Sequence, residues 1–519
     1  MHLRILSAAI LLTLASICTQ VTADVRLPRI FTDHMVLQRE MPVNVWGWAD
    51  PGEKVTVEIA GQSHSATADA EGKWRVTLQP LAVGEPLKMA VKGKNQVKVN
   101  DILVGEVWVC SGQSNMEWPI SLSYGADLVR TEANVPQIRL LSVKPVGAQT
   151  PNDDIDERWQ VCTPETVNGF SAVGYHFGRQ LHETLGVPIG LINNAWGGSS
   201  CEAWVSREKF EGEALYEPML ARWKQTESEY DEAKLRADYE AQLAEWRKAR
   251  DAAEAKGEAV PGRPGSDNPL FTQHRPGNLF NARIVPLAPF AIRGAIWYQG
   301  ESNAGRAYQY REMFPLMISS WREAWGQGDF PFYWVQLADF KDEKPEPAES
   351  DWAELREAQT MTLDRLPKTG EAVIIDIGEG KDIHPRNKED VGERLARWAL
   401  ANDYGVQIDH ASPRYDHFEV QGNKAIVTFR HFGEGLMVFD VPEIRGFALA
   451  GKDRKWHVAQ AKVISPNHQV EVTCEAVPEP IAVRYAWADN PMVNLYSSSG
   501  LPVTPFRTDD WPGVTANNK

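Results

Sequence analysis

The alternation of hydrophobic and polar positions changes character twice along this 519-residue chain. Between residues 25 and 100, apolar and polar side chains alternate in short runs separated by Gly, Pro and Asn, as in Val43–Trp48, Val55–Ile59 and Trp74–Leu78. A period of two residues is typical of strands with one buried face. We therefore expect residues 24–100 to form a β-rich N-terminal domain.

From about residue 101, nearly continuous apolar runs alternate with amphipathic segments, which is typical of a parallel sheet covered by helices on both faces. The predicted strands are Ile102–Cys110, Pro188–Trp196, Ile292–Gly300, Phe332–Leu337 and Ala372–Ile377. Apolar residues recur at helical spacing over Phe170–Leu185, Met313–Trp321 and Val391–Trp398. Residues 101–410 are thus expected to form an open α/β domain.

A charged, alanine-rich stretch at about 217–258 interrupts this pattern, and the Pro and Gly residues of 261–265 end it. Its aromatic and leucine residues recur every few positions, which predicts a helical insertion facing solvent. A role as a lid or dimer contact stays open. Strand patterns return in Lys424–Phe429 and Ala482–Trp487, so residues 411–519 are expected to form a β-rich C-terminal region.

Composition and charge exclude several classes of function. With 43% hydrophobic and 24% charged residues, the chain has the composition of a soluble globular protein. Its formal net charge of -16 argues against nucleic acid and anionic membranes as partners. No apolar stretch reaches the roughly 20 residues that a membrane-spanning helix needs, so no membrane insertion is expected.

The first residues have the pattern of an export signal. His2 and Arg4 precede an apolar run over residues 5–17, and small residues follow at 21–23. We expect residues 1–23 to be a cleaved signal peptide and the mature protein to be periplasmic or extracellular. Four cysteines are left in the mature chain: Cys110, Cys162, Cys201 and Cys474. Their spacing is not that of a CxxC metal site, and disulfides and free thiols are equal alternatives for them.

Residues suited to acyl transfer follow the predicted strands. The first strand runs into Ser111–Met116, so Ser114 lies in a tight turn at the carboxyl end of a strand, where open α/β sheets bind ligands. A serine hydroxyl becomes a nucleophile when a positioned base takes its proton. His384 and Asp382 follow the last predicted strand. We expect His384 to be the base and Asp382 to orient its imidazole.

Acyl transfer also needs hydrogen-bond donors for the oxyanion that develops on the carbonyl oxygen. Gly197 and Gly198 follow the second predicted strand, and the missing Cβ lets a backbone N–H approach a ligand closely. Beyond Tyr298, the third strand leads into Gln299–Asn303, which offers side-chain amides. The Ser114 N–H, a backbone N–H in the Gly197–Ser199 turn and one of these amides are therefore predicted to form a three-point oxyanion hole.

Blocks of sequence in a fixed order resemble the sialate O-acetylesterase group of the SGNH hydrolase superfamily over essentially the whole mature chain. They are Phe31–Arg39, Gly112–Glu117, Trp196–Ser199, Ile296–Ala304 and Asp382–Pro385. The resemblance implies a flavodoxin-like three-layer α/β/α domain with no metal or organic cofactor, and hydrolysis of acetyl esters on sugars, foremost 9-O-acetyl sialates. It also implies that Ser114 is the nucleophile and His384 the base with Asp382 as its partner, and that Gly198 and Gln299 join Ser114 as oxyanion donors.

Two departures from the superfamily pattern affect these assignments. The third block reads Gln299-Gly-Glu-Ser-Asn303 where the superfamily commonly has Gly-x-Asn-Asp, which weakens Gln299 as the third donor. Relatives also place the aspartate three residues before the histidine, a position that is Lys381 here. Glu301 is therefore a rival to Asp382 as the group that orients the imidazole.

Several alternatives stay open at this point. The substrate could instead be acetylated xylan or another polysaccharide, and Arg275 and Arg386 are the candidates for binding a sialate carboxylate. A carbohydrate-binding protein without catalysis is the alternative from another class. The oligomeric state is not predicted. The tryptophans beside the blocks are expected to be mostly core residues instead of sugar platforms: Trp118, Trp196, Trp204 and Trp297.

Overall fold

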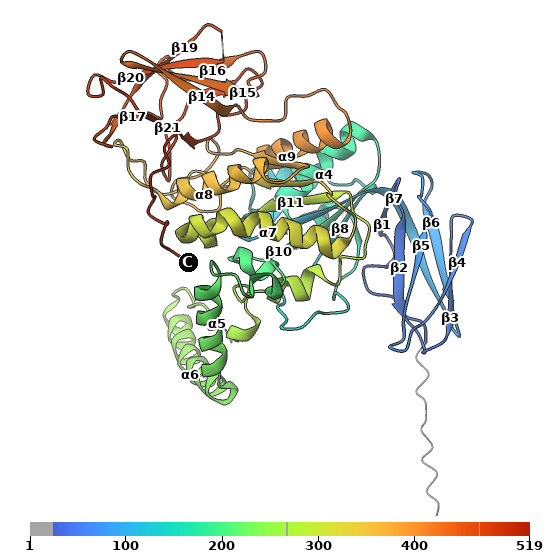
Figure 1. The fold of residues 1–519 in the computed structure, drawn as a ribbon. Helices are drawn as coiled ribbons and strands as arrows, with labels where there is room; N and C mark the ends of the chain where they lie inside the picture. The colour runs from blue at the N-terminus through green and yellow to red at the C-terminus, as the bar shows by residue number, and fades with distance from the viewer. Residues whose placement is uncertain (1–23, 266–267, 467) are drawn as a thin grey trace, which may run out of the picture.

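The computed structural model describes residues 24–265, 268–466 and 468–519. A β-rich region, a central α/β region and a second β-rich region follow one another along the chain, and a helical hairpin projects from the central region (Figure 1). The predicted signal peptide, residues 1–23, lies outside the described residues.

The N-terminal region confirms the period-two pattern, because inward residues of β2 and β5 are buried and their neighbours are more exposed. Its strands are β1 (Val36–Gln38), β2 (Val43–Trp48), β3 (Lys54–Ile59), β4 (Gln62–Thr67), β5 (Lys73–Leu78) and β6 (Leu87–Lys92). The next strand, β7 (Gln96–Gly112), pairs with β6 and then continues into the central sheet. The boundary predicted at residue 100 therefore lies inside a strand that both regions share.

The central sheet has the strand order β13-β12-β11-β7-β10-β8-β9. Its pairs are parallel except for β8 and β9. The strands besides β7 are β8 (Ile138–Ser142), β9 (Gln160–Val161), β10 (Ile189–Ala195), β11 (Gly294–Tyr298), β12 (Phe332–Val335) and β13 (Thr369–Ala372). With β8 and β9 at the edge left out, the order across the sheet is β10-β7-β11-β12-β13, which is 2-1-3-4-5 when these five strands are numbered along the chain.

The predicted strand Ala372–Ile377 is wrong, because β13 ends at Ala372. The apolar residues beyond it are buried for another reason: Val373 and Ile375 pack into the core of the C-terminal region, while Ile374 packs under the central sheet. Alternating burial against two different cores thus produced an apolar run that resembles a buried strand.

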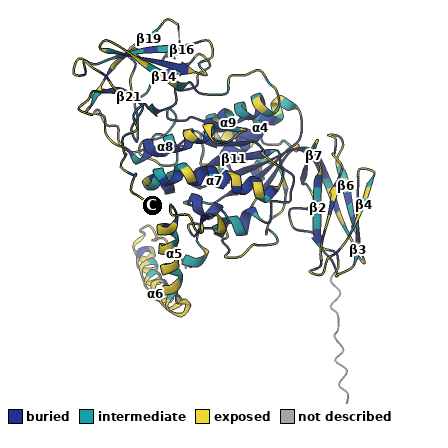
Figure 2. Cartoon of the chain, viewed as in Figure 1, coloured by how far each residue is buried: buried dark blue, intermediate teal, exposed yellow. Residues whose placement is uncertain are grey.

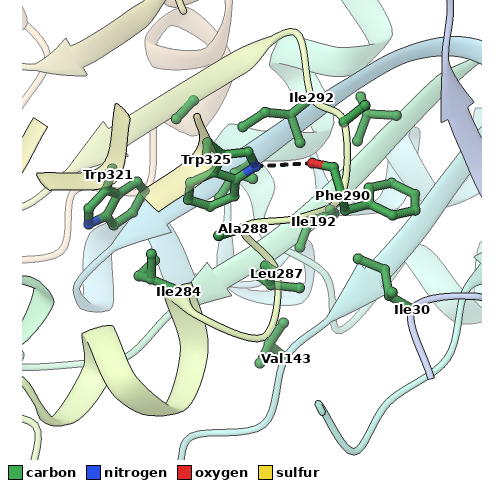
Figure 3. Close-up of a cluster of buried hydrophobic side chains, with 14 of the residues drawn as sticks. Ile30, Val143, Ile192, Ile284, Leu287, Ala288, Phe290, Ile292, Trp321 and Trp325 are labelled. Carbon is green, nitrogen blue, oxygen red and sulfur yellow. Dashed lines mark hydrogen bonds between the residues drawn. The ribbon is translucent and has the colours of Figure 1, made fainter. Parts of the chain in front are cut away.

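Helices cover both faces of the central sheet (Figure 2). On one face, α4 (Ala172–Leu185) and α9 (Lys388–Asp403) share a core with Trp108 of β7, whereas α7 (Ala307–Trp325) and its neighbour α8 (Asp351–Met361) pack on the other. Figure 3 shows part of the second core, where Trp325 of α7 donates its indole N–H to the carbonyl of Phe290 at 3.0 Å.

Shorter helical segments connect these elements. The α-helical ones are α1 (Ser114–Glu117), α2 (Ala126–Glu132) and α3 (Pro164–Val167). A π-helical turn covers Phe280–Ile284. The 3-10 turns are Ile120–Leu122, Cys201–Trp204, Arg207–Phe210, Pro269–Phe271, Glu301–Arg306 and Thr362–Asp364.

The stretch predicted as a helical insertion contains α5 (Glu217–Glu229) and α6 (Glu232–Lys256). Most of this hairpin is exposed, and only Leu243 and Ala253 of α6 are buried (Figure 2). Few apolar side chains of α6 are buried against the rest of the protein, and its polar faces are exposed to solvent.

The C-terminal region is β-rich as predicted. Its strands are β14 (Arg414–Gln421), β15 (Lys424–Arg430), β16 (Leu436–Val438), β17 (Phe447–Ala450), β18 (Trp456–Val458), β19 (Gln460–Ile464), β20 (Gln469–Thr473), β21 (Ala482–Tyr485), β22 (Leu495–Ser497) and β23 (Phe506–Arg507). The buried Arg356 of α8 donates to the carbonyls of Ala488 and Asp489, which fixes this region to the central one. In the described ranges, no helix is long and apolar enough to cross a membrane.

Candidate active site

Ser114 begins the short helix α1, directly after β7 reaches the carboxyl edge of the sheet. The turn depends on Gly112, whose φ is +137° and whose added Cβ would lie 2.1 Å from the carbonyl oxygen of Tyr298. Gln113 then donates its backbone N–H to the same carbonyl at 2.9 Å. The close approach of β7 and β11 therefore requires glycine before the serine.

His384 lies beside Ser114, with 2.8 Å between its Nε2 and the serine Oγ. This distance is within hydrogen-bond range, so the imidazole can take the hydroxyl proton. The ring stacks on Trp118, with 4.8 Å between the ring centroids and 13° between the planes. The structure thus brings together the predicted nucleophile and base from segments 270 residues apart.

Asp382 is the carboxylate beside the other imidazole nitrogen. Its Oδ1 lies 3.7 Å from Nδ1 of His384, and the same atom accepts the backbone N–H of His384 at 2.9 Å. A separation of 3.7 Å permits attraction between charges but exceeds a hydrogen bond. The rival, Glu301, binds the side chain of Asn115 instead. Asp382 therefore holds the loop backbone and faces the ring only at longer range.

Two backbone N–H groups beside Ser114 are available for an oxyanion. Gly198, in the left-handed region at φ +70°, and Ser114 itself have backbone N–H groups with no protein partner among the described residues. The neighbouring Gly197 lies close to the nucleophile, because a Cβ there would be 3.5 Å from the Ser114 Cβ. Its own N–H donates to Glu117 at 2.6 Å, which fixes the Gly197-Gly198 turn.

The prediction that the Gln299 side chain donates to the oxyanion is wrong in this structure. The residue is fully buried, and its Nε2 donates to the Ser199 carbonyl at 3.1 Å and to Asn303 Oδ1 at 2.7 Å. Its Oε1 accepts the hydroxyl of Tyr310 at 3.0 Å. Because an amide nitrogen has two hydrogens, both donors are occupied within the protein.

Gln113, which sequence reasoning did not single out, has a free side-chain donor instead. Its Oε1 accepts the backbone N–H groups of Gly300 at 3.3 Å and Ser302 at 3.4 Å. Among the described residues no group pairs with its Nε2, and this nitrogen is not fully buried. The signal was available, because Gln113 stands directly before the nucleophile in the second block.

The two arginines considered for a sialate carboxylate are both paired with protein groups. Arg275 is buried and binds Glu227 of α5 at 2.9 Å, so its charge faces the helical hairpin. Arg386 is exposed, but its guanidinium binds Glu379 through Nε at 3.1 Å and Nη2 at 3.0 Å. Neither arginine therefore offers an unpaired positive charge beside Ser114.

Two of the tryptophans beside the sequence blocks lie in the hydrophobic core. Trp204 and Trp297 are fully buried and pack edge to face, so they are core residues. Over residues 24–265, 268–466 and 468–519, no cluster of His, Cys, Asp and Glu could hold a metal ion. Within the same ranges the cysteines are free thiols: Cys110, Cys162, Cys201 and Cys474.

Comparison with known proteins identifies related esterases. A family model described as a carbohydrate esterase, sialic acid-specific acetylesterase, matches residues 104–237 and 278–400. The human sialate O-acetylesterase is 30% identical over 545 residues, which cover 95% of this chain and 94% of that protein. The chain belongs to the sialate O-acetylesterase family.

Other members of the sialate O-acetylesterase family and a solved structure extend the likeness. The mouse sialate O-acetylesterase is 28% identical, with 96% of each chain covered. The crystal structure of a carbohydrate acetylesterase from Xanthomonas citri matches with a TM-score of 0.78 and 37% identity, covering 94% of this chain and all of that one. The part of the chain between the two matched ranges, 238–277, holds most of α6, so most of this helix lies outside the family model.

With His384 as the predicted base, its surroundings predict the acid limit of activity. Burial lowers the pKa of His384 below its ordinary value of 6.5; the Lys388 ammonium lowers it further and Asp382 opposes the shift. Because the base must be neutral, kcat/KM is expected to fall only as the pH drops through a value below about 6.5. A pH profile of acetyl ester hydrolysis measures this limb, and a midpoint above 6.5 would contradict the prediction.

Proposed function

We propose that this protein hydrolyses acetyl esters on sugar hydroxyls through an acetyl-serine intermediate on Ser114. The observation that carries the proposal is the 2.8 Å contact between Ser114 Oγ and His384 Nε2, next to the free N–H groups of Ser114 and Gly198. A nucleophile, its base and donors for the developing charge are the groups that acyl transfer requires. Family membership supports the substrate class, a carbohydrate acetyl ester.

The geometry supports a two-step reaction. Ser114 Oγ attacks the acetyl carbon while His384 takes the hydroxyl proton, and the negative charge moves to the carbonyl oxygen. The imidazolium then gives its proton to the sugar oxygen as the ester C–O bond breaks, which leaves acetyl-Ser114. A water that loses one proton to His384 attacks the acetyl carbon, and that proton returns to Ser114 as acetic acid leaves, which ionises to acetate in water. Asp382 stabilises the imidazolium by its charge.

The proposed oxyanion hole consists of the N–H groups of Ser114 and Gly198 and the side-chain amide of Gln113. Gln113 takes the place assigned to Gln299 from the sequence, because its Nε2 has no partner in the described structure. The two backbone contacts to its Oε1 hold the carboxamide in one orientation. Fixed donors of this kind stabilise the transition state without reorganisation.

Gln113→Ala is expected to lower kcat by about 10²-fold with little change in KM, because the lost donor acts on charge present mainly in the transition state. Steady-state kinetics on 4-nitrophenyl acetate measure the effect, and Gln180→Ala is the matched control, because this side chain of α4 bonds only Thr184 of its own helix. Gln299→Ala should lower the melting temperature, since it breaks a buried network. A folded Gln113→Ala protein with unchanged kcat would rule out this donor.

For the catalytic region we propose the flavodoxin-like three-layer α/β/α architecture of SGNH hydrolases. The strand positions 2-1-3-4-5 and the helices on both faces of the sheet support it. Ser114 and the Gly300 loop then follow the two adjacent strands β7 and β11, where connections diverge to opposite sides of the sheet. Ligands of doubly wound sheets bind at such a position.

Acetylated sialic acid is the first substrate to test, since the family relatives are sialate O-acetylesterases. A second candidate, an acetylated sugar without a carboxylate such as acetylated xylan, is favoured by the pairing of Arg275 and Arg386 with Glu227 and Glu379. A sialate carboxylate normally requires a cation or several N–H donors. Acetate release from 9-O-acetyl sialic acid and from acetylated xylan, compared at equal acetyl concentration, decides between them.

We also propose that the protein is exported. The basic start, the apolar run over residues 5–17 and the small residues at 21–23 support cleavage before Asp24. Sequencing the N-terminus of protein recovered from the periplasm or medium of an expressing bacterium tests this proposal. An uncleaved chain retained in the cytosol would contradict it.

A further inference from the structure

A buried chain of polar contacts behind Ser114 has no part in the reaction steps above. At its centre is Asn115, which is 1% exposed. Its Nδ2 donates to Glu301 Oε1 at 2.7 Å and to the carbonyl oxygen of Ile383 at 2.9 Å, and its Oδ1 accepts from Lys388 Nζ at 2.5 Å. One carboxamide thus joins the nucleophile turn, the 3-10 turn after β11, the loop of the base and helix α9.

The two charged side chains at the ends of this chain of polar contacts are costly to bury. Lys388 is 1% exposed, and burial lowers its pKa to about 7 while Glu301 acts in the opposite direction. Glu301 Oε2 is buried with no partner among the described residues, and burial raises the pKa of this carboxyl. A buried pair of charges that is bridged by one amide is weak evidence for stability, so a positioning role has to be considered.

The contacts of Asn115 connect the two reacting side chains. Asn115 follows the nucleophile Ser114 in the chain, and Ile383 precedes the base His384. The Lys388 ammonium can only donate, so it fixes the oxygen of the Asn115 carboxamide toward itself and leaves the nitrogen for the Ile383 carbonyl. The orientation of one amide therefore sets how the base loop lies against the nucleophile turn.

We propose that Asn115 and Lys388, completed by Glu301, are positioning residues that hold His384 in hydrogen-bond contact with Ser114. The inference deepens the proposed esterase function and rests on it. None of the three side chains touches the reacting atoms; they act through the loop backbone at Ile383 and the turn at Ser114.

Lys388 has a second, electrostatic effect on His384. The charged groups that face the imidazole are Asp382 on its own loop and Lys388 from α9, with Glu301 behind Asn115. Trp118 of the segment after α1 covers one ring face without a charge. Removing the Lys388 ammonium leaves the acidic groups unopposed, so the pKa of His384 rises and the acid limb of kcat/KM moves to higher pH.

The test compares Asn115→Asp and Lys388→Met, using 4-nitrophenyl acetate kinetics across pH and thermal melting. Asn115→Asp keeps the shape but loses both donors and places a carboxylate against the Ile383 carbonyl. We expect kcat to fall about 10- to 100-fold with KM nearly unchanged, because small misplacement of a catalytic group has costs of this size. Lys388→Met should lower kcat and also shift the acid limb upward, whereas the exposed control Lys248→Met should do neither.

The double variant Lys388→Met/Glu301→Gln separates positioning from stability. It removes both buried charges together, so it is expected to melt at a higher temperature than Lys388→Met while its kcat stays low. A folded double variant with the kcat and acid limb of the unmodified protein would overturn the inference. Ser114→Ala tests the esterase mechanism separately from the positioning proposal. If that variant stays active, the esterase mechanism fails. If it is inactive, the results for Asn115 and Lys388 bear on the positioning proposal alone.

Discussion

Ser114→Ala is expected to abolish hydrolysis of acetyl esters, with kcat/KM lower by about 10⁴-fold or more. The alanine methyl group cannot attack the acetyl carbon, so the acetyl-enzyme pathway is lost. A loss of 10⁴ corresponds to about 5.5 kcal/mol of transition-state stabilisation. The two backbone donors at Ser114 and Gly198 remain, which leaves only the residual catalysis that an oxyanion hole provides.

The substitution should leave the fold intact, which makes the kinetic result interpretable. The contact that Ser114 Oγ makes in the described structure is the one to His384, and the side chain is only partly buried. Melting temperature is therefore expected to be unchanged within error. Ser228→Ala, an exposed serine on α5 that bonds only its own helix, is the matched control and should keep full activity.

A direct view of the intermediate strengthens this test. Rapid acid quenching during turnover of 4-nitrophenyl acetate should leave one acetyl group on the peptide that contains Ser114, and this label should be absent from the alanine variant. Undiminished turnover by Ser114→Ala, or an acetyl group on a different residue, would contradict the assignment of the nucleophile.

The Ser114 and His384 pair was predictable because each residue follows an apolar segment that leads to the same side of the molecule. The predicted strand that ends in a Gly-containing turn is present in the structure, since β7 ends at Gly112 and α1 begins at Ser114. The prediction did not depend on correct strand bounds. His384 reached its place although the strand expected before it ends at Ala372.

The role of Gln299 could not be predicted from its place in the chain. Its position at the end of β11 suggested a donor, but its carboxamide already forms hydrogen bonds with Ser199, Asn303 and the Tyr310 hydroxyl from α7. Which of two glutamines keeps a free N–H depends on such contacts between distant segments. Lys388 was missed for a similar reason, because a lysine at the start of an amphipathic helix is normally solvated.

His384→Ala is the second substitution with a large expected effect, a loss of about 10⁴-fold in kcat/KM, because His384 is the base that contacts the Ser114 hydroxyl. Imidazole added to the assay should restore part of the activity, since the variant leaves a space beside Trp118 that the free base can enter. His417→Ala, an exposed histidine of β14, is the matched control.

Asp382→Ala is expected to have a much smaller effect, about 10-fold, because the carboxylate is 51% exposed and lies 3.7 Å from Nδ1 of His384. Water screens a charge at that position, and its firmest contact is to the loop backbone. The ratio of the two losses therefore measures how far catalysis depends on a base alone or on a complete triad. A loss for Asp382→Ala equal to that for His384→Ala would show that the carboxylate closes to hydrogen-bond distance when substrate is bound.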